Sequence, residues 1–312
     1  MNKLLILSAD ACEYARLVAA AQLPNLEVTT ANDIESGLVK APDCNIILGN
    51  PRLVSGVLQS AVNLQWVQSS WAGVNDLCRP GLRRDYRLTG VKDVFGPLIS
   101  EYVITYLFAH ERRVFTMRSN QLERCWSPLP YRPARDISLG IVGLGSIGRH
   151  LARTARQFGL RVTGLNRSGS ACDDVEKVYT AENIEEFLAE PDYVVLVLPD
   201  TLATRDFIKA DTLRMMKSTA VLMNVGRGSS VREADLVWAL QQGLIGGAVL
   251  DVFAQEPLAP DSLLWGLPNV FVTPHNAATS IPGDIVGIFA ENFRRFLQNE
   301  PLLHVVDFEL GY

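Results

Sequence analysis

The chain has 312 residues, of which 48% are hydrophobic and 20% are charged, a composition typical of a globular protein with substantial cores. This length is enough for two packed domains. A net charge of -5 and an isoelectric point near 5.5 argue against a nucleic-acid-binding surface, because such a surface needs a basic face. The net charge does not exclude a local basic pocket that binds a small anion.

The five cysteines are widely spaced and odd in number, so we expect reduced thiols rather than a disulfide framework or a metal site. The apolar run near the N-terminus is short, and Asp10 follows it at once. It is typical of a buried first strand rather than a signal peptide. No stretch approaches the length of a membrane span. These features predict a cytoplasmic protein with no membrane and no nucleic-acid partner.

Short apolar runs alternate with helical patterns, such as residues 14–21, from the start of the chain. The expected strands are residues 4–7, 26–29, 46–48 and 64–67. Alternation of this kind predicts a parallel sheet with helices on both faces. A long helical pattern then begins near Pro97 and ends in a charged cluster at residues 111–113. We interpret it as a helix that links two domains.

A proline-rich, irregular segment at residues 126–133 precedes a second alternating series. Gly159 and Gly243 are expected to stop two of its helices. Ser230, with Glu233 three residues later, has capping-box spacing for the helix that Gly243 closes. The expected strands are residues 139–142, 161–165, 193–198, 220–225, 248–250 and 270–272. Six such units make a complete dinucleotide-binding fold.

Residues 143–148 read Gly-Leu-Gly-Ser-Ile-Gly and match the pattern G-x-G-x-x-G. The pattern alone also fits an ordinary glycine-rich turn, but here it follows a strand and opens an amphipathic helix. Gly143 permits the tight turn, Gly145 lets the backbone approach a pyrophosphate, and Gly148 lets helix and strand pack closely. The helix N-terminus, at Ser146 and Ile147, presents free amides to the phosphates.

The residues after the next strand indicate which dinucleotide binds. An Asp or Glu there accepts a hydrogen bond from the 2′-hydroxyl of NAD, but this chain has Asn166, Arg167 and Ser168. Arg167 can hold a 2′-phosphate through charge-assisted hydrogen bonds, and Asn166 and Ser168 can add donors. The alternative for Arg167 is a solvated loop charge. We expect NADPH (NADP) as the preferred cofactor, with NAD possible.

Three polar segments, at residues 224–228, 251–257 and 273–278, each follow an apolar strand. Open α/β sheets bind their ligands at the carboxyl ends of the strands. The segments supply a fixed cation in Arg227, a carboxylate in Glu256 and an imidazole in His275. Taken singly, these residues also fit a surface charge, a loop residue and a structural histidine.

In order and spacing, these motifs resemble the D-isomer-specific 2-hydroxyacid dehydrogenase family over nearly the whole chain. The chain is most similar to the bacterial glyoxylate/hydroxypyruvate reductase A group of that family. The resemblance implies that Arg227 holds the carboxylate and carbonyl oxygen of a 2-keto acid, to which a planar guanidinium is suited. It implies that His275 protonates the carbonyl oxygen as general acid. It also implies that Glu256 bonds the imidazole and favours its charged form.

The resemblance extends to binding residues. The segment of Trp71, Ala72, Gly73 and Val74 is similar to the family's substrate loop, in which backbone amides bind the substrate carboxylate. The family often has Asp where this chain has Asn75. The cofactor contacts that the resemblance implies, beyond those named above, are Leu198, Pro199, Thr204, Val225 and Asp251.

The sequence thus predicts an α/β protein with two Rossmann-like domains, parallel sheets and an active-site cleft between the domains. The expected substrate domain is discontinuous and flavodoxin-like, at residues 1–96 and 281–312, and residues 97–280 form the NAD(P)-binding domain. The expected activity is NADPH-dependent reduction of glyoxylate or hydroxypyruvate to D-2-hydroxy acids. Alternatives are a reductase of bulkier 2-keto acids, an NADH-dependent relative, or a nucleotide-sensing protein without catalysis. The resemblance also implies a homodimer, with the segment around Trp126 in the contact.

Overall fold

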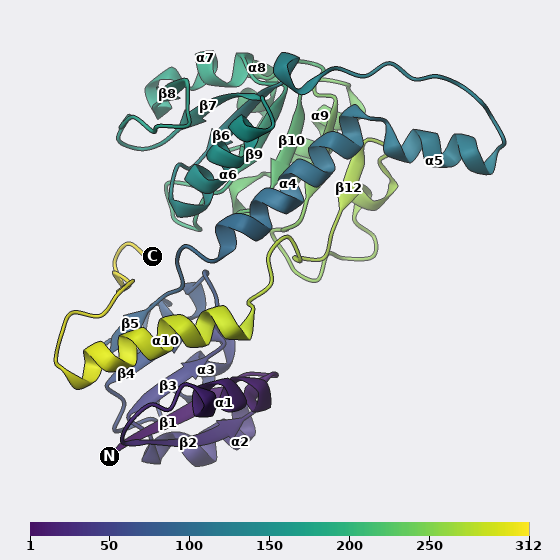
Figure 1. The fold of residues 1–312 in the computed structure, drawn as a ribbon. Helices are drawn as coiled ribbons and strands as arrows, with labels where there is room; N and C mark the ends of the chain where they lie inside the picture. Colours follow the sequence, from purple (N-terminus) through teal and green to yellow (C-terminus); the bar gives the residue numbers. More distant parts are fainter. Residues whose placement is uncertain (312) are drawn as a thin grey trace. The chain divides into compact units, whose positions relative to one another are not determined.

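A computed structural model describes residues 1–311, which form two compact units. The first unit comprises Met1–Val94 and the segment from Ser280 onward, and the second comprises Phe95–Thr279. Each unit contains one sheet, and every pairing between the named strands is parallel. The predicted α/β class with two parallel sheets is therefore confirmed (Figure 1). Within residues 1–311, no helix combines the length and apolar character needed to cross a bilayer.

The first unit has a five-stranded sheet in the order β2-β1-β3-β4-β5, the strand order of flavodoxin-like folds. Its strands are β1 (Asn2–Leu7), β2 (Leu26–Ala31), β3 (Ile46–Gly49), β4 (Trp66–Ser69) and β5 (Arg87–Thr89). The helices are α1 (Ala11–Ala20), α2 (Ile34–Lys40), α3 (Pro51–Val57) and, from the end of the chain, α10 (Pro282–Leu297). Phe289 of α10 stacks on Trp66 of β4 with ring centroids 5.2 Å apart, which fixes the C-terminal helix on this sheet.

The second unit has a seven-stranded sheet in the order β12-β11-β10-β9-β6-β7-β8. The order reverses at β6 and β9, as in a dinucleotide-binding fold. Its strands are β6 (Ser138–Val142), β7 (Arg161–Leu165), β8 (Lys177–Tyr179), β9 (Tyr193–Leu196), β10 (Val221–Asn224), β11 (Gly247–Leu250) and β12 (Val270–Val272). Its helices are α4 (Phe95–Glu111), α5 (Val114–Leu122), α6 (Ser146–Gln157), α7 (Ile184–Ala189), α8 (Ala210–Met215) and α9 (Glu233–Gln241).

Helices cover both faces of the second sheet, so its strands are apolar on both sides. On β6, Ile141 faces a core that includes residues of α4 and α6, and Val142 faces the opposite core, with residues of α7, α8 and α9. This alternation follows from the two-residue period of a strand. The rigid, doubly covered sheet holds the loops at its strand ends in fixed positions.

Gly159 and Gly243 end helices α6 and α9, as predicted. Each glycine has a positive φ, 85° and 65°, a conformation that glycine adopts without a side-chain penalty. After α6, the Gly159 amide donates to Arg156 and the Leu160 amide to Ala155, the Schellman pattern.

One local expectation differs from the structure, and three short elements were not predicted. Ser230 does not cap α9; its hydroxyl donates to the Arg227 carbonyl at 2.7 Å, and Arg232 occupies the cap position. Strands β5 and β8 were not predicted, because three-residue strands carry little periodic signal. Helix α5 was also not predicted, and none of its residues is buried.

Candidate functional site

The loops that follow β6, β9, β10, β11 and β12 lie along one edge of the second sheet, because these strands are parallel neighbours. Every motif segment that the sequence singled out in this unit lies in one of these loops or directly after β7. The fold therefore gathers them at the carboxyl edge, where such sheets bind ligands.

The glycine loop after β6 has the shape that a dinucleotide phosphate requires. Gly143 has a φ of 103°, and a Cβ on Gly148 would lie 2.0 Å from the Gly143 carbonyl oxygen, so neither position tolerates a side chain. A Cβ on Gly145 would meet nothing within 4 Å. Gly145 thus leaves open space directly before the N-terminus of α6, where the first amides have no partner within the helix and the dipole end is positive. These residues fit a bound pyrophosphate.

The loop after β7 is organised by its own side chains. The side-chain oxygen of Asn166 accepts from the Gly169 amide at 2.6 Å, and the side-chain nitrogen donates to the Ser170 carbonyl at 3.1 Å. Asn166 therefore shapes the loop with both ends of its side chain. The hydroxyls of Ser168 and Ser170 lie 2.8 Å apart, and Arg167 is exposed between Asn166 and Ser168. Exposed hydroxyls and a guanidinium are suitable donors for a phosphate.

The predicted cofactor residues after β9 close a compact loop. The Thr204 hydroxyl donates to the Pro199 carbonyl at 2.6 Å and accepts from the Thr201 amide at 2.9 Å. Leu198 is half-buried against the core, and Val225, after the neighbouring strand, is buried. These residues lie at the carboxyl edge of the sheet, between the glycine loop and the loop of Arg227.

The turn after β10 sets the position of Arg227. Buried Asn224 accepts from the Gly226 amide at 3.2 Å and donates to the Arg227 carbonyl at 3.0 Å. A Cβ on Gly228 would lie 1.9 Å from the backbone of Phe253, so this turn presses directly on the loop after β11. Burial lowers the pKa of the Arg227 guanidinium, and the negative charges of Asp200 and Glu256 oppose that shift.

Glu256 and His275 form a pair across two neighbouring loops. The imidazole Nδ1 lies 2.7 Å from Oε2 of Glu256, and Oε1 accepts from the Phe253 amide at 3.0 Å. The backbone amide thus orients the carboxylate, and the carboxylate orients the ring. Because Nδ1 is engaged by the carboxylate, Nε2 lies on the side of the ring away from Glu256.

Electrostatics favour the charged form of this pair. The hydrogen bond with Glu256 raises the pKa of His275 above its ordinary value; burial and the charge of Arg227 act against this, while Glu256 and Asp251 add to it. Partial burial alone would raise the pKa of Glu256. The bonds from His275 and Phe253, with the charges of His275 and Arg227, outweigh burial and lower that pKa. Arg227 therefore lies within electrostatic reach of both partners.

Asp251, at the end of β11, anchors the His275 loop. Its carboxylate accepts from the amides of Asn276 and Ala277, both at 2.9 Å, and from the Thr273 hydroxyl at 2.6 Å. Its backbone carbonyl accepts from the His275 amide at 2.9 Å. Asp251 is buried, so its contacts within this unit hold the loop.

The substrate-loop residues lie in the first unit, directly after β4. The Ser69 hydroxyl donates to the Trp71 carbonyl at 2.7 Å and accepts from the Trp71 amide at 3.0 Å. Trp71 and Ala72 are exposed, Gly73 is half-buried and Val74 is buried. The structure thus brings Arg227, Glu256 and His275 together in one unit and leaves Trp71 to Val74 in the other.

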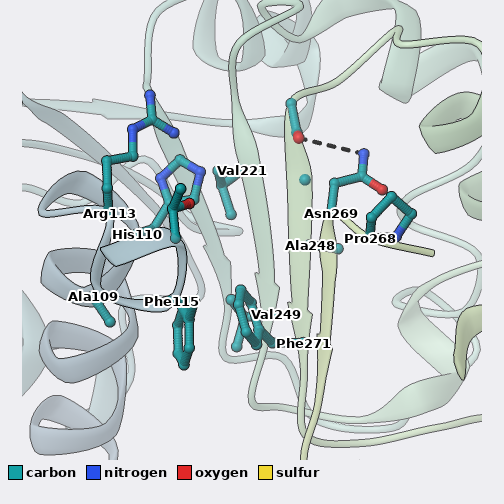
Figure 2. Close-up of a pocket in the computed structure, with 13 residues that line it drawn as sticks. Ala109, His110, Arg113, Phe115, Val221, Ala248, Val249, Pro268, Asn269 and Phe271 are labelled. Carbon is teal, nitrogen blue, oxygen red and sulfur yellow. Dashed lines mark hydrogen bonds between the residues drawn. The ribbon is translucent and has the colours of Figure 1, made fainter. Parts of the chain in front are cut away.

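A cavity of about 250 Å³ in the second unit is separate from these residues. It lies at the amino-terminal edge of the sheet, where Val221 begins β10 and Gly247 begins β11. Figure 2 shows Arg113, His110 and Phe115 on one side of it and Asn269 on the other, bonded to a backbone carbonyl. This edge is opposite the one that carries the motifs.

Sequence reasoning missed two residues that make contacts at the carboxyl edge, Asp200 and Tyr102. Asp200 accepts from Ser229 at 2.8 Å and adds a negative charge near Arg227. The Tyr102 hydroxyl, from α4, lies 2.6 Å from the Thr273 hydroxyl. Both residues join segments far apart in the chain, so no local pattern identifies them. Within residues 1–311, no group of three His, Cys, Asp or Glu side chains is placed to hold a metal ion.

A sheet of this strand order, with its glycine loop and an imidazole–carboxylate pair at one edge, defines a dinucleotide-binding oxidoreductase. A family model described as "D-isomer specific 2-hydroxyacid dehydrogenase, NAD binding domain" matches residues 104–277, more than half of the chain. The chain therefore belongs to the D-isomer specific 2-hydroxyacid dehydrogenase family.

Relatives of known name agree with this assignment. Glyoxylate/hydroxypyruvate reductase A of Photorhabdus laumondii is 32% identical over 217 residues, which cover 70% of this chain and 69% of that protein. A solved family member from Aeromonas salmonicida is 41% identical, with a TM-score of 0.95 over 98% of this chain and 99% of its own. The NADPH-dependent glyoxylate/hydroxypyruvate reductase of Sinorhizobium meliloti, solved with NADP and sulfate, is 30% identical, with a TM-score of 0.90 over 100% of both chains.

Proposed function

We propose that this protein reduces small 2-keto acids, such as glyoxylate and hydroxypyruvate, to D-2-hydroxy acids with NADPH. The observation that carries the proposal is the pairing of His275 with Glu256 at 2.7 Å, within electrostatic reach of the half-buried cation of Arg227. A 2-keto acid offers a carboxylate to a guanidinium and a carbonyl oxygen to an acid. The named relatives support the choice of glyoxylate and hydroxypyruvate.

In this proposal each residue has one task. Arg227 binds the carboxylate and the carbonyl oxygen through its planar fork. Glu256 holds the imidazole through Nδ1, so Nε2–H of His275 donates the proton to the carbonyl oxygen as the alkoxide develops. The nicotinamide, when bound, supplies the hydride to C2. The backbone amides of residues 72–74, in the substrate domain proposed for residues 1–96 and 281–312, bind the substrate carboxylate, whereas the Trp71 amide already donates to Ser69. Residues 97–280 form the proposed NAD(P)-binding domain.

The cofactor assignment rests on the two loops at the carboxyl edge. Gly143, Gly145 and Gly148, with Ser146 and Ile147, would hold the pyrophosphate, and Leu198, Pro199, Thr204, Val225 and Asp251 would line the rest of the site. Arg167 and Ser168 would hold the 2′-phosphate of NADPH through charge-assisted bonds. The structure modifies the expectation for Asn166, whose amide already bonds Gly169 and Ser170. We therefore assign Asn166 the task of shaping this loop.

We also propose that the protein forms a homodimer through α5 and the segment after it. Figure 1 shows this arm extending away from the sheet of its own unit. No residue of α5 is buried, and Met117 and Leu122 are exposed. Trp126 is 96% exposed. Apolar surface concentrated on one projecting segment is typical of a subunit contact. A cytoplasmic location remains a prediction.

A steady-state panel tests the function. NADPH or NADH oxidation is followed with glyoxylate, hydroxypyruvate and a bulky phenyl-substituted 2-keto acid, and the product is analysed for its configuration. We expect the highest kcat/KM with NADPH and one of the small acids, and a D product from hydroxypyruvate. Preference for the bulky acid or for NADH would replace the proposal with the corresponding alternative. Tight NADPH binding without turnover of any acid would favour a nucleotide sensor.

A further inference from the structure

A continuous chain of hydrogen bonds joins the long helix α4 to the loop of His275. The Tyr102 hydroxyl on α4 lies 2.6 Å from the Thr273 hydroxyl. The Thr273 hydroxyl lies 2.6 Å from Oδ1 of Asp251. The same Oδ1 accepts from the Asn276 amide at 2.9 Å, and Oδ2 accepts from the Ala277 amide at 2.9 Å. Two side chains thus separate α4 from the carboxylate that anchors the loop.

The direction of each bond in this chain is fixed by chemistry. Asp251 accepts from two amides and therefore also accepts the single proton of Thr273. The Thr273 oxygen is then left as an acceptor, so the Tyr102 hydroxyl must be the donor. Burial raises the pKa of Tyr102 well above its ordinary value, which keeps this phenol protonated at every working pH.

The loop needs such an anchor because His275 has an unfavourable backbone. Its φ is 53°, in the left-handed region that few residues other than glycine adopt. Three successive amides, those of His275, Asn276 and Ala277, all donate to Asp251 and hold the chain in this turn. If the Asp251 carboxylate rotated, two of these three bonds would break. The bond from Thr273 opposes that rotation.

We propose that Tyr102 and Thr273 are positioning residues for the general acid, acting through Asp251 on the backbone of His275. The inference rests on the proposed function of His275 and deepens it. The phenol on α4 restrains Thr273, Thr273 restrains the carboxylate, and the carboxylate fixes the left-handed turn from which the imidazole reaches Glu256. Loss of the phenol hydroxyl leaves the packing of the Tyr102 ring in place but removes the restraint on the Thr273 hydroxyl.

The first test compares Tyr102→Phe with Tyr106→Phe in the full-length protein. Tyr106 is the matched control because it lies one turn further along α4 with its ring centroid 4.6 Å from that of Tyr102, and its hydroxyl is not part of the chain described above. We expect Tyr102→Phe to lower kcat roughly tenfold through misplacement of the acid. The Kd for NADPH should change less than kcat, because Asp251 is one of several residues assigned to the cofactor site, whereas His275 is the single acid proposed for the reaction. Tyr106→Phe should keep both kcat and the Kd for NADPH within about twofold of the wild-type values.

A second readout requires no substrate. The chain has four histidines, so the His275 signal in a spectrum of protein with labelled histidine rings is assigned by its loss in His275→Gln. Besides its partner Glu256, the charged groups that act on His275 are Asp251 and Arg227. A loosened loop weakens the bond to Glu256, and the pKa of His275 should fall in Tyr102→Phe but not in Tyr106→Phe. Unchanged kcat and an unchanged His275 titration in a folded Tyr102→Phe would overturn the proposal.

Thr273 provides an independent pair if Tyr102→Phe fails to fold. Thr273→Val keeps the shape and removes the hydroxyl, whereas Thr273→Ser keeps the hydroxyl. We expect the valine variant to show the same losses and the serine variant to recover most of the wild-type kcat and His275 titration. Equal behaviour of the two variants would contradict the proposal. If no 2-keto acid is turned over even by wild type, the proposed function fails, and the titration alone still decides the positioning role.

Discussion

Nδ1 of His275 lies 2.7 Å from Oε2 of Glu256, although the two residues belong to loops after different strands. Because Nδ1 is engaged by Glu256, the acid–base role proposed for His275 falls to Nε2, and the protonation state of the ring depends on Glu256. This relationship gives the most direct prediction for the pH dependence of the enzyme.

Glu256→Gln should move the alkaline limb of the reduction rate to lower pH. In the proposed mechanism reduction requires protonated His275, so kcat/KM is high below the pKa of His275 and is lost as pH rises through it. The hydrogen bond and charge of Glu256 raise that pKa; without them, burial and Arg227 lower it toward or below its ordinary value. The pH profile of kcat/KM for 2-keto acid reduction measures the shift. An alkaline limb at the wild-type position would show that Glu256 does not control the acid.

Arg227→Lys should impair the reaction even though the charge is kept. Lysine is a point charge without a planar fork, so we expect kcat/KM for the keto acid to fall about 100-fold, and further in Arg227→Ala. Steady-state kinetics measure the fall in kcat/KM, and an unchanged melting temperature shows that the variants remain folded. Arg214→Ala is the control, because Arg214 lies on α8 and pairs with Asp211 at its surface. Wild-type kinetics in both Arg227 variants would remove the substrate-binding assignment.

Arg167→Ala should weaken NADPH binding and leave NADH binding nearly unchanged. Only NADPH carries the 2′-phosphate, and one charge-assisted contact corresponds to roughly a 10- to 100-fold change in Kd. Titration of both nucleotides, followed by nicotinamide fluorescence, gives the ratio. Arg156→Ala serves as a control, since Arg156 lies at the C-terminal end of α6 and pairs with Glu176. Equal losses for NADPH and NADH would contradict a phosphate contact.

Gly145→Ala and Gly148→Ala should fail in different ways. A Cβ at position 145 meets nothing within 4 Å, whereas a Cβ at 148 would lie 2.0 Å from a backbone oxygen. We expect Gly145→Ala to keep its melting temperature but to bind either dinucleotide about tenfold more weakly, because the methyl group fills the phosphate space. Gly148→Ala should lose folding stability. Calorimetric melting and nucleotide titration separate the two effects; normal binding by Gly145→Ala would refute the phosphate assignment.

Disruption of the α5 arm should change the oligomeric state. We expect wild type to sediment at twice the chain mass, and the double variant Met117→Glu with Leu122→Glu to sediment at the chain mass. Carboxylates in a subunit contact would be buried without partners. Val39→Glu is the control, because Val39 is 76% exposed and belongs to α2 of the first unit. A monomeric wild type, or a double variant that remains dimeric, would rule out this contact.

Features governed by short-range rules were predictable from the sequence. The apolar runs became strands, and Gly159 ended α6 because a left-handed residue is needed there. The local rule failed at Ser230, where capping-box spacing was present but the hydroxyl bonds the Arg227 carbonyl. Glu233 likewise accepts from the Ala254 amide instead. The Ser230 hydroxyl therefore bonds a local acceptor three residues earlier, and Glu233 bonds a backbone amide 21 residues later, so neither side chain forms the capping box.

By itself the sequence determined the chemical groups: a guanidinium, a carboxylate, an imidazole and a glycine loop, each after an apolar strand. Only the tertiary structure decided which of them meet. The order β10-β11-β12 brings the loop of Asp251 and Glu256 between those of Arg227 and His275, and Tyr102 reaches Thr273 from a helix 171 residues earlier. Strand order and helix packing depend on contacts between distant residues, which leave no periodic trace along the chain.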